Sequence, residues 1–390
     1  MSTPSIRSTF VRHIFSGSAL RHCSLSPRSP ALSARKLPDT QFKSDNHHNQ
    51  SRHDHYFAAN TKIVPHEDYT VGWICALPIE MAAAKAMLDD IHPKLPQPPN
   101  DHNTYTLGRI GGHNVVVACL PAGIYGTTSA AQVASQMIFT FGAIRFGLMV
   151  GIGGGVPSAE NDIRLGDVVV SEPSGTFGGV VQYDYGKTIS GGRFQRTGAL
   201  NKPPQVLLTA ITDLKADYMM GINRIPKFLS EMVAKHPAMM SKFTYCGQRQ
   251  DRLFQEEYDH LGSRNICNDC DKSRLMARPS RVTNEPIVHY GLIASGNQVM
   301  KHGYTRDRLA RELNILCFEM EAAGLMDHFP CLVIRGICDY ADSHKNKQWQ
   351  EYAAATAAAY AKELLSVTSI IQTKKTAIAR TAISDVSKSL

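Results

Sequence analysis

Short apolar runs alternate with helical stretches along most of this 390-residue chain, and this alternation limits the folds open to it. Pro78 follows the first run and suits the first turn of a helix, where proline's missing N–H is not needed. Thr127 or Thr128 begins another helix, which Gly142 ends. Alternating strands and helices predict a three-layer α/β/α domain with a twisted, mixed central sheet. Strands are expected at 69–75, 103–109, 114–120, 148–150, 166–171, 287–293 and 332–337, and helices at 79–88, 127–141, 201–240, 305–314, 319–328 and 348–370.

Two stretches near the C-terminus combine apolar strands with acidic side chains. One places Glu319, Met320 and Glu321 at the start of the helix expected over 319–328, and the other is an apolar strand that ends at Asp339. Ligands of open α/β sheets bind at the carboxyl ends of the strands, so this placement favours chemistry. Acidic residues also favour helix N-termini, so the Glu-Met-Glu run alone is equally compatible with plain capping.

Four sequence blocks, taken together, point to a family. The blocks are Ala76-Leu77-Pro78-Ile79-Glu80, Val150-Gly151-Ile152-Gly153-Gly154, Gly291-Leu292-Ile293-Ala294-Ser295-Gly296, and Phe318–Glu321 with Asp339–Asp342. In this order they resemble the purine nucleoside phosphorylase and nucleosidase superfamily over nearly all of residues 69–366. The resemblance implies a twisted sheet flanked by helices, a homo-oligomer (dimer or hexamer), and cleavage of the N-glycosidic bond of purine nucleosides or adenine nucleotides.

The resemblance also implies roles for single residues. In such a cleavage the sugar passes through an oxocarbenium-like state, and an acid helps the purine to leave by protonating N7. The resemblance makes Asp339 this acid, Met320 and Glu321 the ribose contacts, and Glu319 a second polar anchor. Glu80 aligns with the glutamate that activates water in methylthioadenosine/S-adenosylhomocysteine nucleosidases. A glutamate after a prolyl helix start is also a partner for the helix dipole, so that alternative stays open.

Two departures from the family pattern favour water over phosphate as the nucleophile. Hexameric purine phosphorylases carry an arginine and a serine at the positions of Met149 and Ile152, and neither residue found here can bind an oxyanion by its side chain. The backbone N–H groups of Gly153, Gly154 and Gly155 remain candidates for an anion nest. Hydrolysis is therefore expected. The alternatives are phosphorolysis, with inorganic phosphate as co-substrate, and a non-catalytic purine sensor.

The base and 5′ sides of the substrate are less well defined. Ser295 belongs to a matching block, but Val299 stands where the nucleosidases place an aromatic residue over the purine. Stacking is therefore expected from Tyr304 or Phe318. Basic residues near the 5′ side would suit a nucleotide, although solvated surface charge explains them equally well. These residues are Lys187, Arg193, Arg196, Lys345 and Lys347.

Outside the catalytic domain, expected over 65–370, the chain has polar ends and one internal insertion. Residues 1–64 are basic and serine-rich, which is typical of either a disordered extension or a mitochondrial transit peptide. Residues 245–286 are expected to be an insertion and 371–390 a polar tail. Related domains are often followed by ATPase or repeat domains. Because this chain ends at Leu390, a signalling module is expected on a separate polypeptide.

The remaining composition gives few further signals. The 9 cysteines lack disulfide-scaffold spacing, which favours an intracellular, cytoplasmic protein, with the mitochondrion as the alternative. No apolar run approaches the roughly 18 residues of a membrane span, and the net charge of +8 is too dispersed to indicate nucleic-acid binding. Neither a cofactor nor a catalytic metal is expected. Cys267 and Cys270 form half of a zinc site, with Cys246, His260 or His289 as candidate partners. Reduced thiols are the preferred interpretation, because a second cysteine pair is missing.

Overall fold

A mixed sheet forms the centre of the part of the chain that this computed structural model describes, residues 63–262 and 266–381. Its strand order is β11-β10-β6-β12-β5-β1-β4-β3-β2, and β7 pairs with β10. The strands are β1 (Val71–Cys75), β2 (Asp90–His92), β3 (Tyr105–Ile110), β4 (His113–Cys119), β5 (Phe146–Gly155), β6 (Val168–Ser171), β7 (Val180–Gln182), β10 (Val288–Ser295), β11 (Ile315–Glu319) and β12 (Cys331–Asp339). The fold class predicted from the alternation is confirmed.

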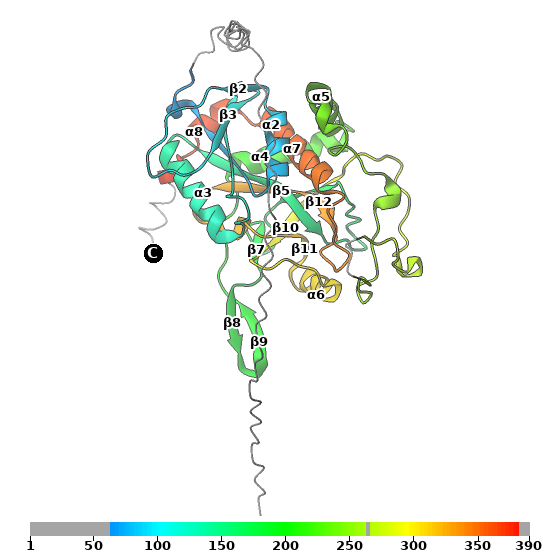
Figure 1. The fold of residues 1–390 in the computed structure, drawn as a ribbon. Coiled ribbons are helices and arrows are strands. Elements are labelled where there is room, and N and C mark those ends of the chain that lie inside the picture. The colour runs from blue at the N-terminus through cyan, green and yellow to red at the C-terminus, as the bar shows by residue number, and fades with distance from the viewer. Residues whose placement is uncertain (1–62, 263–265, 382–390) are drawn as a thin grey trace, which may run out of the picture. The chain divides into compact units, whose positions relative to one another are not determined.

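Helices cover both faces of this sheet (Figure 1). One face packs against four helices, α2 (Pro78–Met87), α4 (Gln205–Met219), α5 (Ile225–Lys235) and α7 (Gln350–Val367). The other face packs against α3 (Thr127–Thr140). Side chains of β1 alternate between the two cores, Trp73 facing the first and Ile74 the second, as the period of a strand requires. Alanine-rich α7 is almost entirely buried, because its small side chains let it lie close to β12.

Three strands bring their ends together beside the acidic residues singled out from the sequence. β5 and β12 run parallel and pair from Gly147 with Cys331 to Gly154 with Asp339, so their carboxyl ends coincide. β11 pairs antiparallel with the end of β5, Phe318 opposite Gly154. Asp339 is thus the last residue of a buried strand, as predicted, and Glu319 ends the strand that pairs with the same glycines.

The glycine run after Val150 is a strand and not the expected loop. β5 continues through Gly151 to Gly155, with β12 on one side and β11 at its end. None of these glycines has a positive φ, whereas an anion nest needs successive right- and left-handed residues. The predicted nest is therefore wrong: the run is extended because its backbone completes the sheet.

The helix expected over 319–328 is also absent from the described structure. Glu319 ends β11, Met320 and Glu321 form a turn, and only a 3-10 turn at Ala322–Gly324 follows. The apolar run before Glu319 pairs with β10 and β5. This pairing keeps the backbone extended up to Glu319, so a helix cannot begin there.

The remaining segments lie around this core. Residues 245–286 contain only short 3-10 turns and an isolated bridge among their described positions. β8 (Gly186–Ile189) and β9 (Arg193–Arg196) form a separate two-stranded sheet, and α6 (Gly303–Leu313) packs near β11. The expected domain end at 370 falls inside α8 (Ile370–Lys375), and Ala379 beyond it is buried. The predicted extension over 1–64 lies almost wholly outside the described residues. No helix among the described residues is long and apolar enough to cross a membrane.

Candidate active site

A cavity of about 350 Å³ opens where β5, β11 and β12 end. It brings together most of the residues predicted from the sequence, which come from segments more than 250 positions apart. Those lining it are Glu80, Gly153, Gly154, Val299, Glu319, Met320, Glu321 and Asp339, with Phe318, Lys345, Lys347, Tyr125 and Ile152 among the others. Ser295 lies outside this lining.

Asp339 is buried, and its carboxylate is held from three directions. Oδ1 accepts a hydrogen bond of 2.9 Å from the backbone N–H of Ala341, a residue with the left-handed φ of 53°. Lys345 Nζ lies 2.8 Å from Oδ2, and the Cys338 thiol donates to the same oxygen at 3.0 Å. Gly154 makes room for this arrangement, since a Cβ there would lie 2.8 Å from Asp339 Oδ1. The expected carboxyl group is present, and it is paired with a cation.

Lys345, a candidate for the 5′ side of the ribose, forms an ion pair with Asp339 through its ammonium group. Burial alone would lower the pKa of Lys345, but Asp339, Cys338 and Asp342 together outweigh burial and raise it. The sequence signal for this pairing was a lysine six residues after the aspartate, which does not by itself specify contact.

The loop that carries Lys345 is fastened by the 245–286 segment. The Tyr340 hydroxyl donates to Asp251 and accepts from Arg278 Nη2 at 2.9 Å. The Ser343 hydroxyl accepts a 2.9 Å hydrogen bond from the backbone N–H of His260. One wall of the cavity is therefore supported by residues that the family blocks do not include.

Glu80 lies in the first turn of α2 and reaches across to β5. Its Oε2 accepts from the backbone N–H groups of Ala76 at 2.7 Å and Leu77 at 2.9 Å, and its Oε1 accepts from that of Ile152 at 2.8 Å. Burial raises the pKa of Glu80, while Arg335 and these hydrogen bonds oppose the rise. Glu80 therefore does stabilise the start of α2, and the same hydrogen bonds fix its carboxylate on the cavity wall. A raised pKa brings a carboxylate closer to the range that suits a general base.

Arg335, in the middle of β12, organises the acidic side chains and was missed by the sequence analysis. Its Nη2 contacts Glu319 Oε2 and lies 3.3 Å from Glu321 Oε2, and Arg335 itself is 1% exposed. The available signal was a lone charge inside the apolar run Leu332–Ile337. Such a residue is buried only when it is paired.

The Glu319 carboxylate is paired within the protein. Besides Arg335, it accepts hydrogen bonds from the backbone N–H groups of Glu321 at 3.1 Å and Ala322 at 3.0 Å. These bonds shape the turn after β11, and the role of Glu319 as a second ribose anchor stays a prediction. Ser295 does similar work from β10, where its Oγ accepts from the N–H of Ala323 at 2.9 Å.

Glu321 is the acidic side chain with the most perturbed environment in the cavity. Burial raises its pKa to about 7; Arg335 lowers it in part, and Glu319 and Glu80 raise it further. Near neutral pH this group can therefore accept or donate a hydrogen bond. Met320, beside it, supplies an apolar part of the lining.

The base-stacking and 5′ expectations have mixed outcomes. Phe318 lines the cavity and Tyr304 does not, while Tyr125, which was not predicted, does. Val299 is 44% exposed at the rim. Lys187, Arg193 and Arg196 lie on the β8–β9 hairpin and do not line the cavity, so of the five basic residues only Lys345 and Lys347 reach it.

Several known proteins are similar to this chain. A nucleotide-binding leucine-rich repeat (NLR)-like protein of Hyaloscypha variabilis is 52% identical over 304 residues, which are 78% of this chain; the chain spans only 30% of that protein's length. The 5′-methylthioadenosine/S-adenosylhomocysteine nucleosidase of Mycobacterium tuberculosis is 24% identical over 307 residues, 77% of this chain and 98% of that protein. A solved Helicobacter pylori nucleosidase of the same name is 16% identical and covers 77% of this chain and 98% of its own, with a TM-score of 0.49.

The match that decides the family covers most of the chain. Residues 70–371 match the phosphorylase superfamily, and this range includes every candidate site residue from Glu80 to Lys347. The chain therefore belongs to the phosphorylase superfamily.

Proposed function

We propose that this protein hydrolyses the N-glycosidic bond of purine nucleosides. The observation that carries the proposal is that Asp339, Glu80 and Glu321 line one cavity, although they come from β12, α2 and the turn after β11. An acid for the base, a carboxylate for water and a carboxylate for the ribose are what such a cleavage needs. The similarity to nucleosidases at 24% identity supports the same reaction.

The proposed reaction divides the work among these residues. The C1′–N9 bond breaks with its electron pair moving onto the purine. Asp339, which is ion-paired with Lys345 and so must first take up a proton, passes that proton to N7. Lys345, 2.8 Å from Asp339 Oδ2, is a positioning residue that holds the carboxyl group. Glu80 takes a proton from the water that attacks C1′. Glu321 binds the ribose hydroxyls over Met320. Purine and free ribose leave, and the scheme needs neither a cofactor nor a catalytic metal.

The charged side chains in and around the cavity favour water over phosphate as the nucleophile. Met149, at the position of the phosphorylase arginine, is fully buried in the core. Arg335 is buried and already paired with Glu319 and Glu321, so its charge is compensated before any oxyanion enters. A phosphate ion would meet several carboxylates and no unpaired guanidinium.

The same charges favour a nucleoside over a nucleotide. Four carboxylates line the cavity, and the lysines that line it are Lys345, which is paired with Asp339, and Lys347. A 5′-phosphate adds negative charge to a site where carboxylates outnumber free cations. Neutral purine nucleosides are therefore the proposed substrates.

Product analysis of the purified full chain tests the proposal. We expect free base and free ribose from adenosine or inosine, and adenine with 5-methylthioribose from 5′-methylthioadenosine, in phosphate-free buffer, identified by mass. Asp339→Asn should lower kcat by about 10²- to 10⁴-fold, the usual contribution of a general acid. The matched control is Asp213→Asn, an exposed position on α4, which should keep full activity.

Two results would count against this function. Ribose 1-phosphate formed only when phosphate is supplied would replace hydrolysis with phosphorolysis. Thermal stabilisation by purine nucleosides without any turnover would make the protein a sensor.

A further inference from the structure

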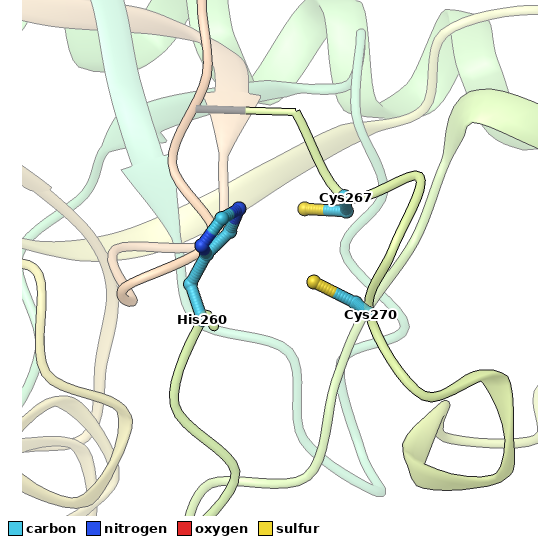
Figure 2. A group of neighbouring side chains, drawn as sticks. All are labelled: His260, Cys267 and Cys270. Atoms are coloured by element: carbon cyan, nitrogen blue, oxygen red, sulfur yellow. The ribbon is translucent and has the colours of Figure 1, made fainter. Parts of the chain in front are cut away.

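Three side chains that commonly bind metals meet in the 245–286 segment, away from the active-site lining. His260, Cys267 and Cys270 each offer one ligand atom, and these atoms lie within 4.8 Å of one another. Figure 2 shows both sulfur atoms directed toward the imidazole of His260. The cysteines are 8% and 5% exposed. The cluster is thus a compact, largely buried group of two thiols and an imidazole.

The structure selects one of the three partners that the sequence left open for this cysteine pair. Cys246 donates its thiol hydrogen to the carbonyl of Gln348 at 3.3 Å, and His289 lies 3.0 Å from Asp167. Neither belongs to the cluster. His260 does, and its Nε2 is buried without a hydrogen-bond partner among the described residues. An unsatisfied buried nitrogen beside two thiols is what a vacant ligand position would leave.

A second imidazole lies in position to complete the group. Both ring nitrogens of His344 are buried and lack hydrogen-bond partners within the described part of the chain. The ring centres of His260 and His344 are 5.6 Å apart. Two imidazoles on one tetrahedral zinc have ring centres about 5 Å apart, because each Zn–N bond is about 2.0–2.1 Å long. His344 lies outside the group of atoms within 4.8 Å, so its ring must turn toward the sulfur atoms to give two sulfur and two nitrogen ligands.

We propose that His260, Cys267, Cys270 and His344 bind one structural zinc ion. Two cysteines separated by two residues, with two histidines, are a common ligand set of closed tetrahedral zinc sites. The four protein ligands leave no open position for a reacting water, so the ion has no catalytic role. This inference does not depend on the proposed hydrolase activity.

The ion would join the 245–286 segment to the loop after β12. Three of its ligands come from the segment, and His344 comes from the loop that also carries Lys345. The two parts already touch, because the His344 ring stacks on Phe254 with ring centres 3.9 Å apart. The Cys267 thiol also lies 3.8 Å from the carbonyl oxygen of His344. Zinc would lock an existing contact on the side of the cavity where Asp339 is held.

Metal analysis of the full chain tests this directly. Protein expressed with zinc and purified without a metal-affinity step should contain one zinc per chain. X-ray absorption should show two sulfur ligands at about 2.3 Å and two nitrogen ligands at about 2.0–2.1 Å. Cys267→Ser with Cys270→Ser should abolish zinc binding. The matched control, Cys246→Ser, replaces a thiol of the same segment and should keep one zinc. His344→Ala should weaken zinc affinity about tenfold or more.

The absorption measurement uses the unaltered protein, so it remains decisive even if the double variant does not fold. A wild-type protein with less than a tenth of an equivalent of zinc, or with Cys267 joined to Cys270 in a disulfide, would overturn the proposal. Zinc retained in full by the double variant would also overturn it. Unchanged zinc affinity in His344→Ala would remove that residue from the ligand set.

Discussion

Glu321 shows how burial changes the chemistry of a single side chain. Its carboxyl group ionises near neutral pH because it is largely buried and close to Glu319 and Glu80. Arg335 compensates in part, but it is shared among the three glutamates. The residue proposed to hold the ribose is therefore also one whose charge changes in the physiological range.

The first prediction at this scale concerns stability as a function of pH. The folded-state pKa of Glu321, about 7, lies above the ordinary 4.5, so the folded chain binds more protons between these values. Stability from this group is present at low pH and is lost as the pH rises through 7. Glutamine cannot ionise. The Tm of Glu321→Gln relative to wild type should therefore increase from pH 5 to pH 8 in calorimetry.

The control for that measurement is Glu67→Gln, an exposed position before β1, which should show a constant difference. A Tm difference for Glu321→Gln that stays flat or falls with pH would contradict the assignment. Activity gives a second readout, because loss of the ribose contact should raise KM for nucleosides.

A second prediction concerns Arg335. Arg335→Met removes the cation that Glu319 and Glu321 share, and leaves buried carboxylates unpaired. Breaking a buried ion pair in this way costs about 3–5 kcal/mol, which denaturant unfolding measures. Arg308→Met serves as the control: its pair with Glu312 is exposed on α6, and such pairs contribute about 0–1 kcal/mol. Equal losses in the two variants would rule out the organising role of Arg335.

At the scale of elements, the glycine run of β5 determines how closely the acidic groups approach the sheet. A Cβ at Gly151 would collide with the Glu80 carboxylate and the Arg335 guanidinium. Glycine is required here for the close approach of side chains, since its φ is not positive. The small size of Gly151 in β5 therefore makes room for the Glu80 carboxylate at the start of α2.

The close approach of Glu80 to Gly151 predicts the effect of adding one methyl group at position 151. Gly151→Ala should displace Glu80 and lower kcat by about 10²-fold, because small misplacements of catalytic groups have effects of this size. Gly142→Ala is the matched control, since a Cβ there meets nothing within 4 Å. Steady-state kinetics on both variants decides the matter. Wild-type kcat in Gly151→Ala would mean that Glu80 is free to move and is not fixed by β5.

Periodicity predicted most of these elements, but it failed where strand pairing decides. The apolar runs that end at Cys75 and Asp339 are strands, and α2 and α7 are helices, as expected. The Glu-Met-Glu run was assigned to a helix because acidic residues favour helix starts. The strand before it pairs with β5 and β10, one of which is distant in the sequence. The helix and strand preferences of single residues cannot predict such pairing.

At the scale of the whole molecule, the family blocks predicted which acidic residues share a cavity, but not the ion pairs that hold them. Glu80, Glu321 and Asp339 line one cavity, as expected from blocks spread over 260 positions. Arg335 and Lys345 were missed as partners, because an ion pair depends on side-chain direction in space. The support of the Lys345 loop by residues 245–286 was equally invisible, since that segment matches none of the blocks.

Assembly stays a prediction from the family resemblance. We expect a homo-oligomer, a dimer or a hexamer of the 42.9 kDa chain, because members of the superfamily usually assemble. Sedimentation velocity over a range of concentrations measures the mass. A single species at the mass of one chain, unchanged at micromolar concentration, would contradict this expectation.

The attachment of Tyr340 and Ser343 to Asp251 and His260 has a practical consequence for anyone shortening this protein. Residues 245–286 look dispensable, since they contribute no strand to the sheet among their described positions. Excising them would keep the described strands of the sheet but remove the contacts that hold the loop of Lys345. A shortened but active variant should therefore retain residues 245–286.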